Sequence, residues 1–224
     1  MEKYQNINIL YEDNHLLVVI KPANIPTCSD ISNDKDLLSI LKDYLKNKYN
    51  KPGNVYLGLV HRLDRPTEGI MVFAKTSKAA SRLSDQIRKN ELNKTYYAVI
   101  ENIPKKEDTL IDYLYKDEKT NTSYVTNEKK GKQAILKYKL ISTKNNLSLV
   151  KINLLTGRHH QIRVQFSTRN YPLYGDHKYN KNFINNNKEN LALIAARLSF
   201  YHPVTKELLN FNIDLPKKYP YNLF

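Results

Sequence analysis

Short apolar runs separated by polar turns occupy the first hundred residues. Two such runs, Ile7–Tyr11 and Leu16–Ile20, flank Glu12-Asp13-Asn14, a composition typical of a turn. A second pair, Leu57–Leu63 and Ile70–Ala74, flanks the polar segment around residues 64–69, and Tyr96–Ile100 follows. The pattern predicts five strands in this half of the chain.

Apolar residues at helical spacing predict three helices. Residues 36–49 place Leu37, Leu41 and Leu45 on one face, with lysines on the other. Ser77 has the composition of an N-cap for a helix that runs to about Asn90. We expect the third helix to begin at Gly157 and to end near Arg169.

The remaining apolar runs are strands with connections of hairpin size. We predict strands near residues 109–114, 123–126, 134–141, 147–154, 191–201 and 208–213. Consecutive strands joined in this way favour an antiparallel meander over repeated βαβ units, so the fold class is α+β. The Asn-rich stretch 180–190 is expected to be a loop.

Composition narrows the class of protein. A length of 224 residues suits one large domain or two small ones, and we expect a single domain over residues 1–224. The apolar runs are too short to cross a bilayer and the N-terminus has no signal-peptide core, which predicts a cytoplasmic location without membrane contact. Cys28 is the single cysteine, so no internal disulfide forms.

The formal net charge of +14 indicates a polyanionic partner such as nucleic acid. Lysine accounts for 28 of the 36 basic residues, and with many Asn, Ile and Tyr this is also the bias of an AT-rich genome. The eight arginines are more informative. Five of them cluster around residues 62–65 and 158–169.

The segment from His61 to Gly69 carries candidate chemistry. Asp64 lies between Arg62 and Arg65, and nearby cations keep a carboxylate ionised by lowering its pKa. An ionised carboxylate is suited to be a covalent nucleophile. An Asp that caps a tight turn is the alternative interpretation of Asp64, and a phosphate contact is the alternative for Arg62.

Two later segments combine aromatic and basic residues. In the strand Lys94-Thr95-Tyr96-Tyr97-Ala98, alternation sends Lys94 and Tyr96 to the same face. Leu155–Arg163 begins with Thr-Gly, and Gly157 permits a sharp turn from strand to helix. Free N–H groups at that helix start would suit a phosphate, with Arg158, His159 and Arg163 projecting at helical spacings.

These blocks resemble, in order, the motifs of the RluA-type RNA pseudouridine synthases. His-Arg-Leu-Asp with Thr-x-Gly, Lys-x-Tyr-x-Ala and Thr-Gly-Arg-x-His-Gln-Ile-Arg all occur, and the likeness runs from about residue 10 to about residue 215. Lys21-Pro22-Ala23-Asn24 resembles the family's Lys-Pro-x-Gly loop, with Asn24 in the place of Gly. Because Asn tolerates left-handed backbone conformations, we expect the turn to survive the change. Glu68 and His159 also depart from the family pattern.

The resemblance implies a fold and a set of roles. It implies a large, mostly antiparallel, bent mixed sheet flanked by helices, with a central basic cleft. Asp64 would be the nucleophile, Tyr96 would pack on the base, and Arg163 would pair with Asp64. Arg62 would fill the space that a flipped base leaves. The RNA-contacting residues would be His61, Arg62, Arg65, Lys94, Arg158 and His159.

The expected reaction isomerises specific uridines of structured rRNA or tRNA to pseudouridine, without cofactor or metal. Attack of Asp64 at C6 or at C1′ of the uridine remains open, and so does the identity of the RNA. We expect a monomer and a stand-alone catalytic domain without an N-terminal S4 domain. The alternatives are a catalytically silent RNA-binding protein and a hydrolase that uses Asp64 and His61.

Overall fold

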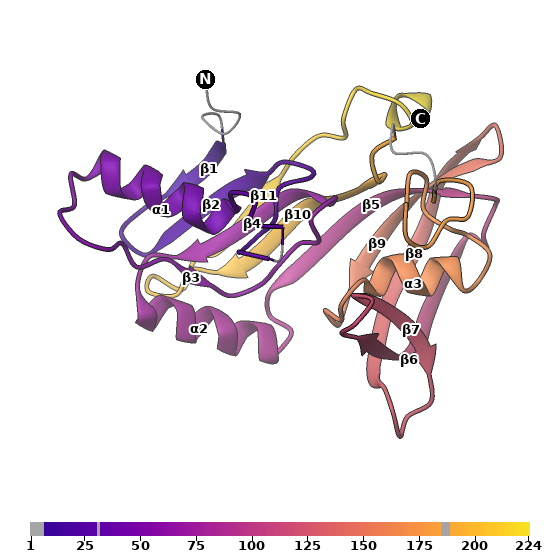
Figure 1. The fold of residues 1–224 in the computed structure, drawn as a ribbon, viewed down its shortest axis with the longest axis horizontal. Helices are drawn as coiled ribbons and strands as arrows, with labels where there is room; N and C mark the ends of the chain where they lie inside the picture. Colours follow the sequence, from indigo (N-terminus) through magenta and orange to yellow (C-terminus); the bar gives the residue numbers. More distant parts are fainter. Residues whose placement is uncertain (1–6, 31, 185–188) are drawn as a thin grey trace. The chain divides into compact units, whose positions relative to one another are not determined.

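The computed structural model describes residues 7–30, 32–184 and 189–224. The chain forms two compact units, one built from the residues up to Leu92 with Arg197–Ile213, the other from Asn93–Ala196 with Asp214–Phe224. The described part contains eleven strands, three α-helices and one 3₁₀ turn, Tyr221–Leu223 (Figure 1). The prediction of an α+β fold is therefore confirmed.

The first unit, unit 1, is an antiparallel sheet around a fully buried strand. Its strands are β1 (Asn8–Glu12), β2 (Leu16–Lys21), β3 (Gly58–Leu59), β4 (Glu68–Ala74), β11 (Leu208–Asn212) and the second part of β10 (Leu193–Tyr201). Strand β2 pairs with β1 on one side and β4 on the other, with Val18 opposite Val72. Residues 16–19 of β2 are all buried, so both faces of the strand are covered.

Two helices supply the cover, and a side chain caps each N-terminus. Helix α1 (Leu37–Lys48) begins after Asp36, which accepts a hydrogen bond from the backbone N of Ser39. Helix α2 (Ser77–Arg88) begins after Thr76, so the expected cap at Ser77 was wrong by one residue. Ala79 and Leu83 of α2 belong to the core on one face of β2 and β4, and Figure 1 shows α1 on the opposite side.

The second unit, unit 2, is the predicted antiparallel meander. Its strands are β5 (Asn93–Glu101), β6 (Glu107–Asp117), β7 (Thr122–Thr126), β8 (Lys132–Lys144) and β9 (Leu147–Leu154), paired in the order β5-β9-β8-β6-β7. Every pairing within this set is antiparallel. The prediction for β9 matches its observed bounds.

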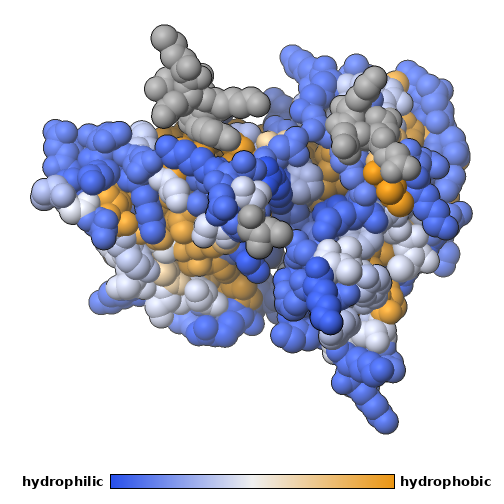
Figure 2. All heavy atoms as spheres, in the orientation of Figure 1, coloured by the Kyte–Doolittle hydropathy of each residue, from blue (hydrophilic) through white to orange (hydrophobic). Residues whose placement is uncertain are grey.

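One face of this sheet is covered by the short helix α3 (Gln161–Ser167), whose Val164 packs with Leu114 and Ala134. Residues that alternate with this core, such as Lys137 and Lys139 of β8, are exposed. Figure 2 shows that the visible surface is mostly hydrophilic. No helix in the described ranges is long and apolar enough to span a membrane.

Two expected elements are shorter than predicted. The strand expected over 57–63 is reduced to β3, because backbone and side-chain groups beyond it bond to other partners, as described below. The third helix begins at Gln161 instead of Gly157, after His160 adopts a left-handed conformation with φ of 53°. The expected loop over 180–190 includes residues 185–188, which lie outside the described part of the chain.

Asparagine supplies most of the left-handed backbone. Nine described asparagines have positive φ, compared with two described glycines. They are residues 24, 33, 50, 90, 102, 121, 145, 146 and 170. Asn24, expected to preserve the turn of the Lys-Pro loop, has φ of 67°. Asn adopts this region at lower cost than other residues with a Cβ, which confirms the expectation.

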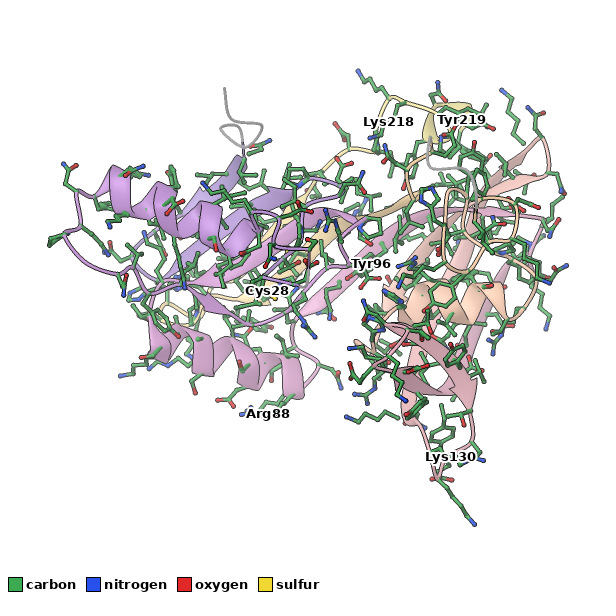
Figure 3. All side chains as sticks on the ribbon, viewed as in Figure 1. Cys28, Arg88, Tyr96, Lys130, Lys218 and Tyr219 are labelled. Carbon is green, nitrogen blue, oxygen red and sulfur yellow. The ribbon has the colours of Figure 1, made fainter. Side chains whose placement is uncertain are left out.

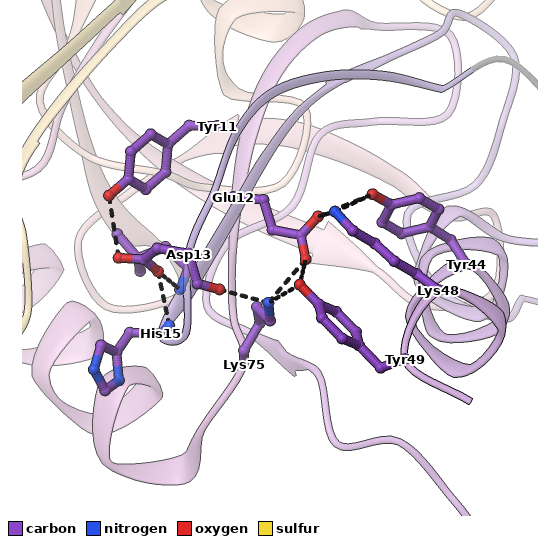
Figure 4. A network of polar contacts seen from close by, with 9 residues as sticks. Tyr11, Glu12, Asp13, His15, Tyr44, Lys48, Tyr49 and Lys75 are labelled. Atoms are coloured by element: carbon purple, nitrogen blue, oxygen red, sulfur yellow. Dashed lines mark hydrogen bonds and ion pairs between the residues drawn. The ribbon is translucent and has the colours of Figure 1, made fainter. Parts of the chain in front are cut away.

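Glu12, at the end of β1, is the centre of a polar network (Figure 4). Its carboxylate accepts hydrogen bonds from Lys48 (2.8 Å), Tyr44 (2.9 Å), Lys75 (2.9 Å) and Tyr49 (2.7 Å). Burial alone would raise the pKa of Glu12, but these four donors outweigh it and lower the pKa to about 2. The network ties α1 to the first strand and to the residue after β4.

We predict that Glu12→Gln reduces the free energy of unfolding by about 1–3 kcal/mol near neutral pH. The folded pKa lies below the unfolded value of about 4.3, so the stabilisation is present above that value and is lost as pH falls from about 5 to about 2. Urea unfolding of both proteins at several pH values measures this. Parallel stability curves for the two proteins over the acid range would contradict it. Glu91→Gln, at an exposed position, is the control.

Candidate active site

A buried lysine organises the backbone around Asp64 in unit 1. Lys21, the last residue of β2, is fully buried, and its ammonium donates to the carbonyl oxygens of Pro22 (2.9 Å), Ile25 (2.7 Å) and Arg65 (2.9 Å). The backbone N of Asn24 donates to the same Arg65 carbonyl at 2.8 Å. The Lys-Pro loop is therefore bonded directly to the residue that follows Asp64.

Three consecutive carbonyl groups at Asp64 are held in this way. The hydroxyl of Thr27 donates to the carbonyl of Leu63 at 2.8 Å, and the backbone N of Thr67 donates to that of Asp64 at 2.9 Å. With the bonds to Arg65, the residue on each side of Asp64 is fixed by a partner at least 36 positions away in the sequence. Such fixation preorganises a side chain for chemistry.

Lys21 also lies in the electrostatic field of Asp64. Burial lowers the pKa of Lys21 to about 7, while the carboxylates of Asp64 and Glu68 act to raise it. The sequence had suggested Arg62 and Arg65 as the cations of this loop. The structure adds Lys21, which sequence reasoning had treated only as part of a turn.

The arginines on either side of Asp64 have different environments. Arg65 donates to Ser32 (2.9 Å) and to Asp34, so its guanidinium is paired with carboxylates of another loop instead of flanking Asp64 as expected. Arg62 is exposed, and its side chain bonds to no described residue. His61 uses Nε2 to accept a hydrogen bond from the backbone N of Val72 at 3.1 Å.

In unit 2, Arg163 forms a buried bidentate ion pair with Asp176. The distances are 2.8 Å from Nε to Oδ2 and 2.7 Å from Nη2 to Oδ1. Backbone N–H groups of Lys178 and Tyr179 also donate to Oδ1 of Asp176. The guanidinium lies 5.1 Å from the centroid of the Tyr179 ring. The sequence had indicated Asp64 as the partner of Arg163 and gave no sign of Asp176.

Tyr179 connects this ion pair to two stacked histidines. Its hydroxyl accepts from the backbone N of Ser123 (2.8 Å) and forms a hydrogen bond with Nδ1 of His160 (2.7 Å). Burial and the nearby Arg163 lower the pKa of His160 strongly, which keeps that ring neutral. His159 stacks on His160 at 3.7 Å, with Nδ1 at 2.9 Å from the Ser123 hydroxyl.

The residues before α3 form a turn that a glutamine closes. Gln161 accepts from the backbone N of Arg158 (3.0 Å) and from the hydroxyl of Thr156 (2.7 Å). Arg158 is exposed and uses Nε to donate to the carbonyl of Gln133. Arg158 and His159 therefore lie in this turn and not on a helix, which corrects the expected helical projection and the expected phosphate site at a helix start.

Tyr96 lies on the face of the unit 2 sheet that α3 covers (Figure 3). The register places Tyr96 opposite Ile152 and Ile152 opposite Tyr138, and the Tyr138 ring contacts Phe166 of α3 at 5.2 Å. Tyr96 is therefore on the same side of the sheet as the helix that carries Arg163. Its side chain is buried.

Lys94 is two residues from Tyr96 on the same strand. Burial lowers the pKa of its ammonium, and it makes no hydrogen bond or ion pair with any described residue. Its Nζ lies 3.6 Å from the point where a side chain at Gly157 would begin. Within the described ranges, no group of three or more acidic, His or Cys side chains could hold a metal ion.

Comparison with known proteins gives a consistent result. The family model for RNA pseudouridylate synthase matches residues 15–168. The chain belongs to this family. The ribosomal large subunit pseudouridine synthase D of Zymomonas mobilis is 31% identical over 94% of this chain and 70% of that protein. An uncharacterized RNA pseudouridine synthase of Bacillus subtilis is 34% identical over 96% and 70%.

Solved structures show the same fold. Human RNA pseudouridylate synthase domain containing 4 superposes with a TM-score of 0.78 at 24% identity, over 94% of this chain and 89% of that one. The resemblance to RluA-type synthases is thus confirmed, and the protein is an RNA pseudouridine synthase, an isomerase. Asp64 belongs to unit 1, whereas Tyr96 and Arg163 belong to unit 2. The Asp64–Arg163 pair and the central basic cleft stay predictions.

We predict that Lys21→Met destabilises the enzyme by about 2–4 kcal/mol, because three hydrogen bonds from a fully buried side chain to carbonyl groups are lost. Where the variant remains folded, kcat should fall while RNA affinity changes by less than about threefold, since Asp64 is displaced and RNA contacts are not. Urea unfolding and steady-state kinetics measure the two effects. Lys78→Met, on the exposed surface of α2, should leave both unchanged.

Proposed function

We propose that this synthase converts uridines of large-subunit ribosomal RNA to pseudouridine, with Asp64 as the nucleophile. The observation that carries the role of Asp64 is the fixation of three consecutive carbonyl groups, those of Leu63, Asp64 and Arg65. A loop held by these hydrogen bonds keeps the Asp64 side chain in one position, as attack on a substrate requires. The names of relatives from Zymomonas mobilis and Buchnera aphidicola support ribosomal RNA as the substrate.

The proposed reaction needs no cofactor. The carboxylate of Asp64 attacks uridine at C6 or at C1′, the N1–C1′ bond breaks, and the base rotates. After attack at C1′, C5 displaces the carboxylate, so the C5–C1′ bond forms as the bond between Asp64 and C1′ breaks. After attack at C6, the C5–C1′ bond forms first and the bond between Asp64 and C6 breaks afterwards. On either route C5 loses its proton, N1 gains one and the Asp64 carboxylate is released. The target base must first be flipped out of its stack. Arg62, exposed and without a bond to described side chains, is suited to fill the vacated space.

Arg163 and Tyr96 have proposed roles in orientation. The pair with Asp176 uses the Nε–Nη2 edge of Arg163, so the Nη1 edge is the one that would orient the carboxylate of Asp64. Tyr96 would pack on the base from the face of the sheet that α3 covers. Since Asp176 holds Arg163 with good geometry, the cation would be ordered before the substrate arrives.

Lys94 and Arg158 are the proposed phosphate contacts. A partly desolvated ammonium without a carboxylate partner among the described residues is suited to an anion that arrives with the substrate. His61, Arg65 and His159 each use part of their polar side chain for bonds within the fold. Their predicted RNA contacts would have to form beside those bonds or replace them.

Asp64→Asn tests the nucleophile. We expect the variant to lose pseudouridine formation by about 10³-fold or more, because an amide is a poor nucleophile, while RNA affinity stays within about threefold. Carbodiimide mapping of pseudouridine in cells without the gene, complemented by wild type or by the variant, identifies the site. Sites restored by the variant would contradict the role of Asp64. An unchanged map in the deletion strain would contradict ribosomal RNA as substrate.

Lys94→Met tests the phosphate contact. We predict that KM for the RNA rises about tenfold and that the dependence of log affinity on log salt becomes shallower by about one unit. The turnover number should change by less than about threefold, because a phosphate contact positions the RNA without touching the reacting atoms. Lys137→Met, exposed on the opposite face of the same sheet, is the matched control. Equal effects of the two substitutions would exclude a specific contact.

A further inference from the structure

Arg65, next to the nucleophile, is engaged by an acidic group on a separate loop. Its Nη1 lies 2.9 Å from the Ser32 hydroxyl and 3.8 Å from Oδ2 of Asp30, and its Nη2 bonds to Asp34. The Ser32 hydroxyl lies 2.6 Å from Asp30 and 3.1 Å from Asp34, so the two carboxylates are joined through it. We call Asp30, Ser32 and Asp34 the acidic triplet.

The backbone of Arg65 is fixed while its side chain remains accessible. Lys21 and Asn24 hold its carbonyl group, so the backbone from which the guanidinium extends is fixed at the residue after Asp64. The side chains of Arg65 and Asp34 are 41% and 46% exposed. Ion pairs this exposed contribute only about 0–1 kcal/mol, so a phosphate brought within reach can replace the carboxylates.

The acidic triplet places two negative charges on the surface of a strongly basic protein. The chain has a net charge of +14, and an exposed guanidinium beside the nucleophile would attract the backbone of any RNA. Two carboxylates at that point neutralise the attraction and repel phosphates that arrive without other contacts. Arg62, on the other side of Asp64, has no such acidic partner among the described residues.

We propose that Asp30 and Asp34 are specificity-determining residues that occupy Arg65 and release it only to a phosphate of a correctly bound target RNA. The inference rests on the proposed RNA substrate. Contacts elsewhere on a true target hold its phosphate next to Arg65 and supply the free energy for the exchange. An RNA without those contacts meets two negative charges and gains nothing from Arg65.

The double substitution Asp30→Asn/Asp34→Asn tests this in the full-length enzyme. The probes are oligouridylate, as non-target RNA, and the transcript that contains the mapped site. We expect affinity for oligouridylate to rise roughly 3–10-fold and its salt dependence to steepen by about one unit, because one more cation meets a phosphate. Discrimination in kcat/KM between target and non-target transcripts should fall.

Two controls separate this effect from net charge. Asp85→Asn/Glu91→Gln removes the same two charges and frees Arg88 from Asp85 on α2, and should leave affinity for oligouridylate near that of wild type. Adding Arg65→Ala to the Asp30→Asn/Asp34→Asn protein should cancel the gain. A gain that persists without Arg65, or that the control pair reproduces, would overturn the proposal.

A purely structural role of the acidic triplet gives a different result. If the pair with Arg65 served only to position Asp64, the double variant would lose turnover on the target without tighter binding of oligouridylate, and the proposal would be wrong. The binding measurements do not require catalysis. They therefore remain decisive even if Asp64→Asn shows that the proposed nucleophile is incorrect.

Discussion

The buried ammonium of Lys21 is the interaction on which the Asp64 loop depends. Removing an ammonium from water is costly, and the cost is offset only because three carbonyl oxygens and two nearby carboxylates surround it. The same bonds join two segments that are 44 positions apart. Strand β2, buried on both faces, provides the rigid base from which Lys21 reaches them.

Unit 2 also contains a buried cation whose hydrogen-bond partners are supplied by the fold. Arg163 is buried and paired with Asp176, and the carboxylate of Asp176 also accepts two hydrogen bonds from backbone N–H groups. In both units the buried cation is satisfied by the fold and fixes a loop. Arg62 and Arg158 are exposed, and Lys94 has no partner among the described residues, which leaves these three able to meet RNA. The cations that hold the loops are thus paired within the fold, whereas those proposed to bind RNA are exposed or have no carboxylate partner among the described residues.

The sequence predicted elements whose signal is local. Strand β9 follows from an apolar run and helix α1 from leucines at helical spacing, and the left-handed turn follows from Asn24. It overestimated the strand at 57–63, because the Leu63 carbonyl and the His61 ring bond to groups that only the fold brings near. The late start of α3 depends on Gln161 closing the preceding turn, which spacing alone does not reveal. The motifs indicated candidate site residues, but not the partners Lys21, Asp176 and the acidic triplet, since those pairings depend on tertiary contacts.

The asparagine turns have a consequence for how the chain can evolve. Glycine codons are rich in G and C, whereas asparagine codons are rich in A and T. A genome with a bias toward A and T therefore favours asparagine over glycine. Because Asn tolerates positive φ, the nine described asparagines with positive φ stand where an A- and T-rich codon is compatible with a left-handed backbone. Asn is also less free than Gly in the unfolded chain, so each exchange recovers part of its conformational cost as reduced unfolded-state entropy. A nucleotide bias can therefore change the residue at these positions without changing the fold, because the backbone conformation, and not the side chain, determines the structure there.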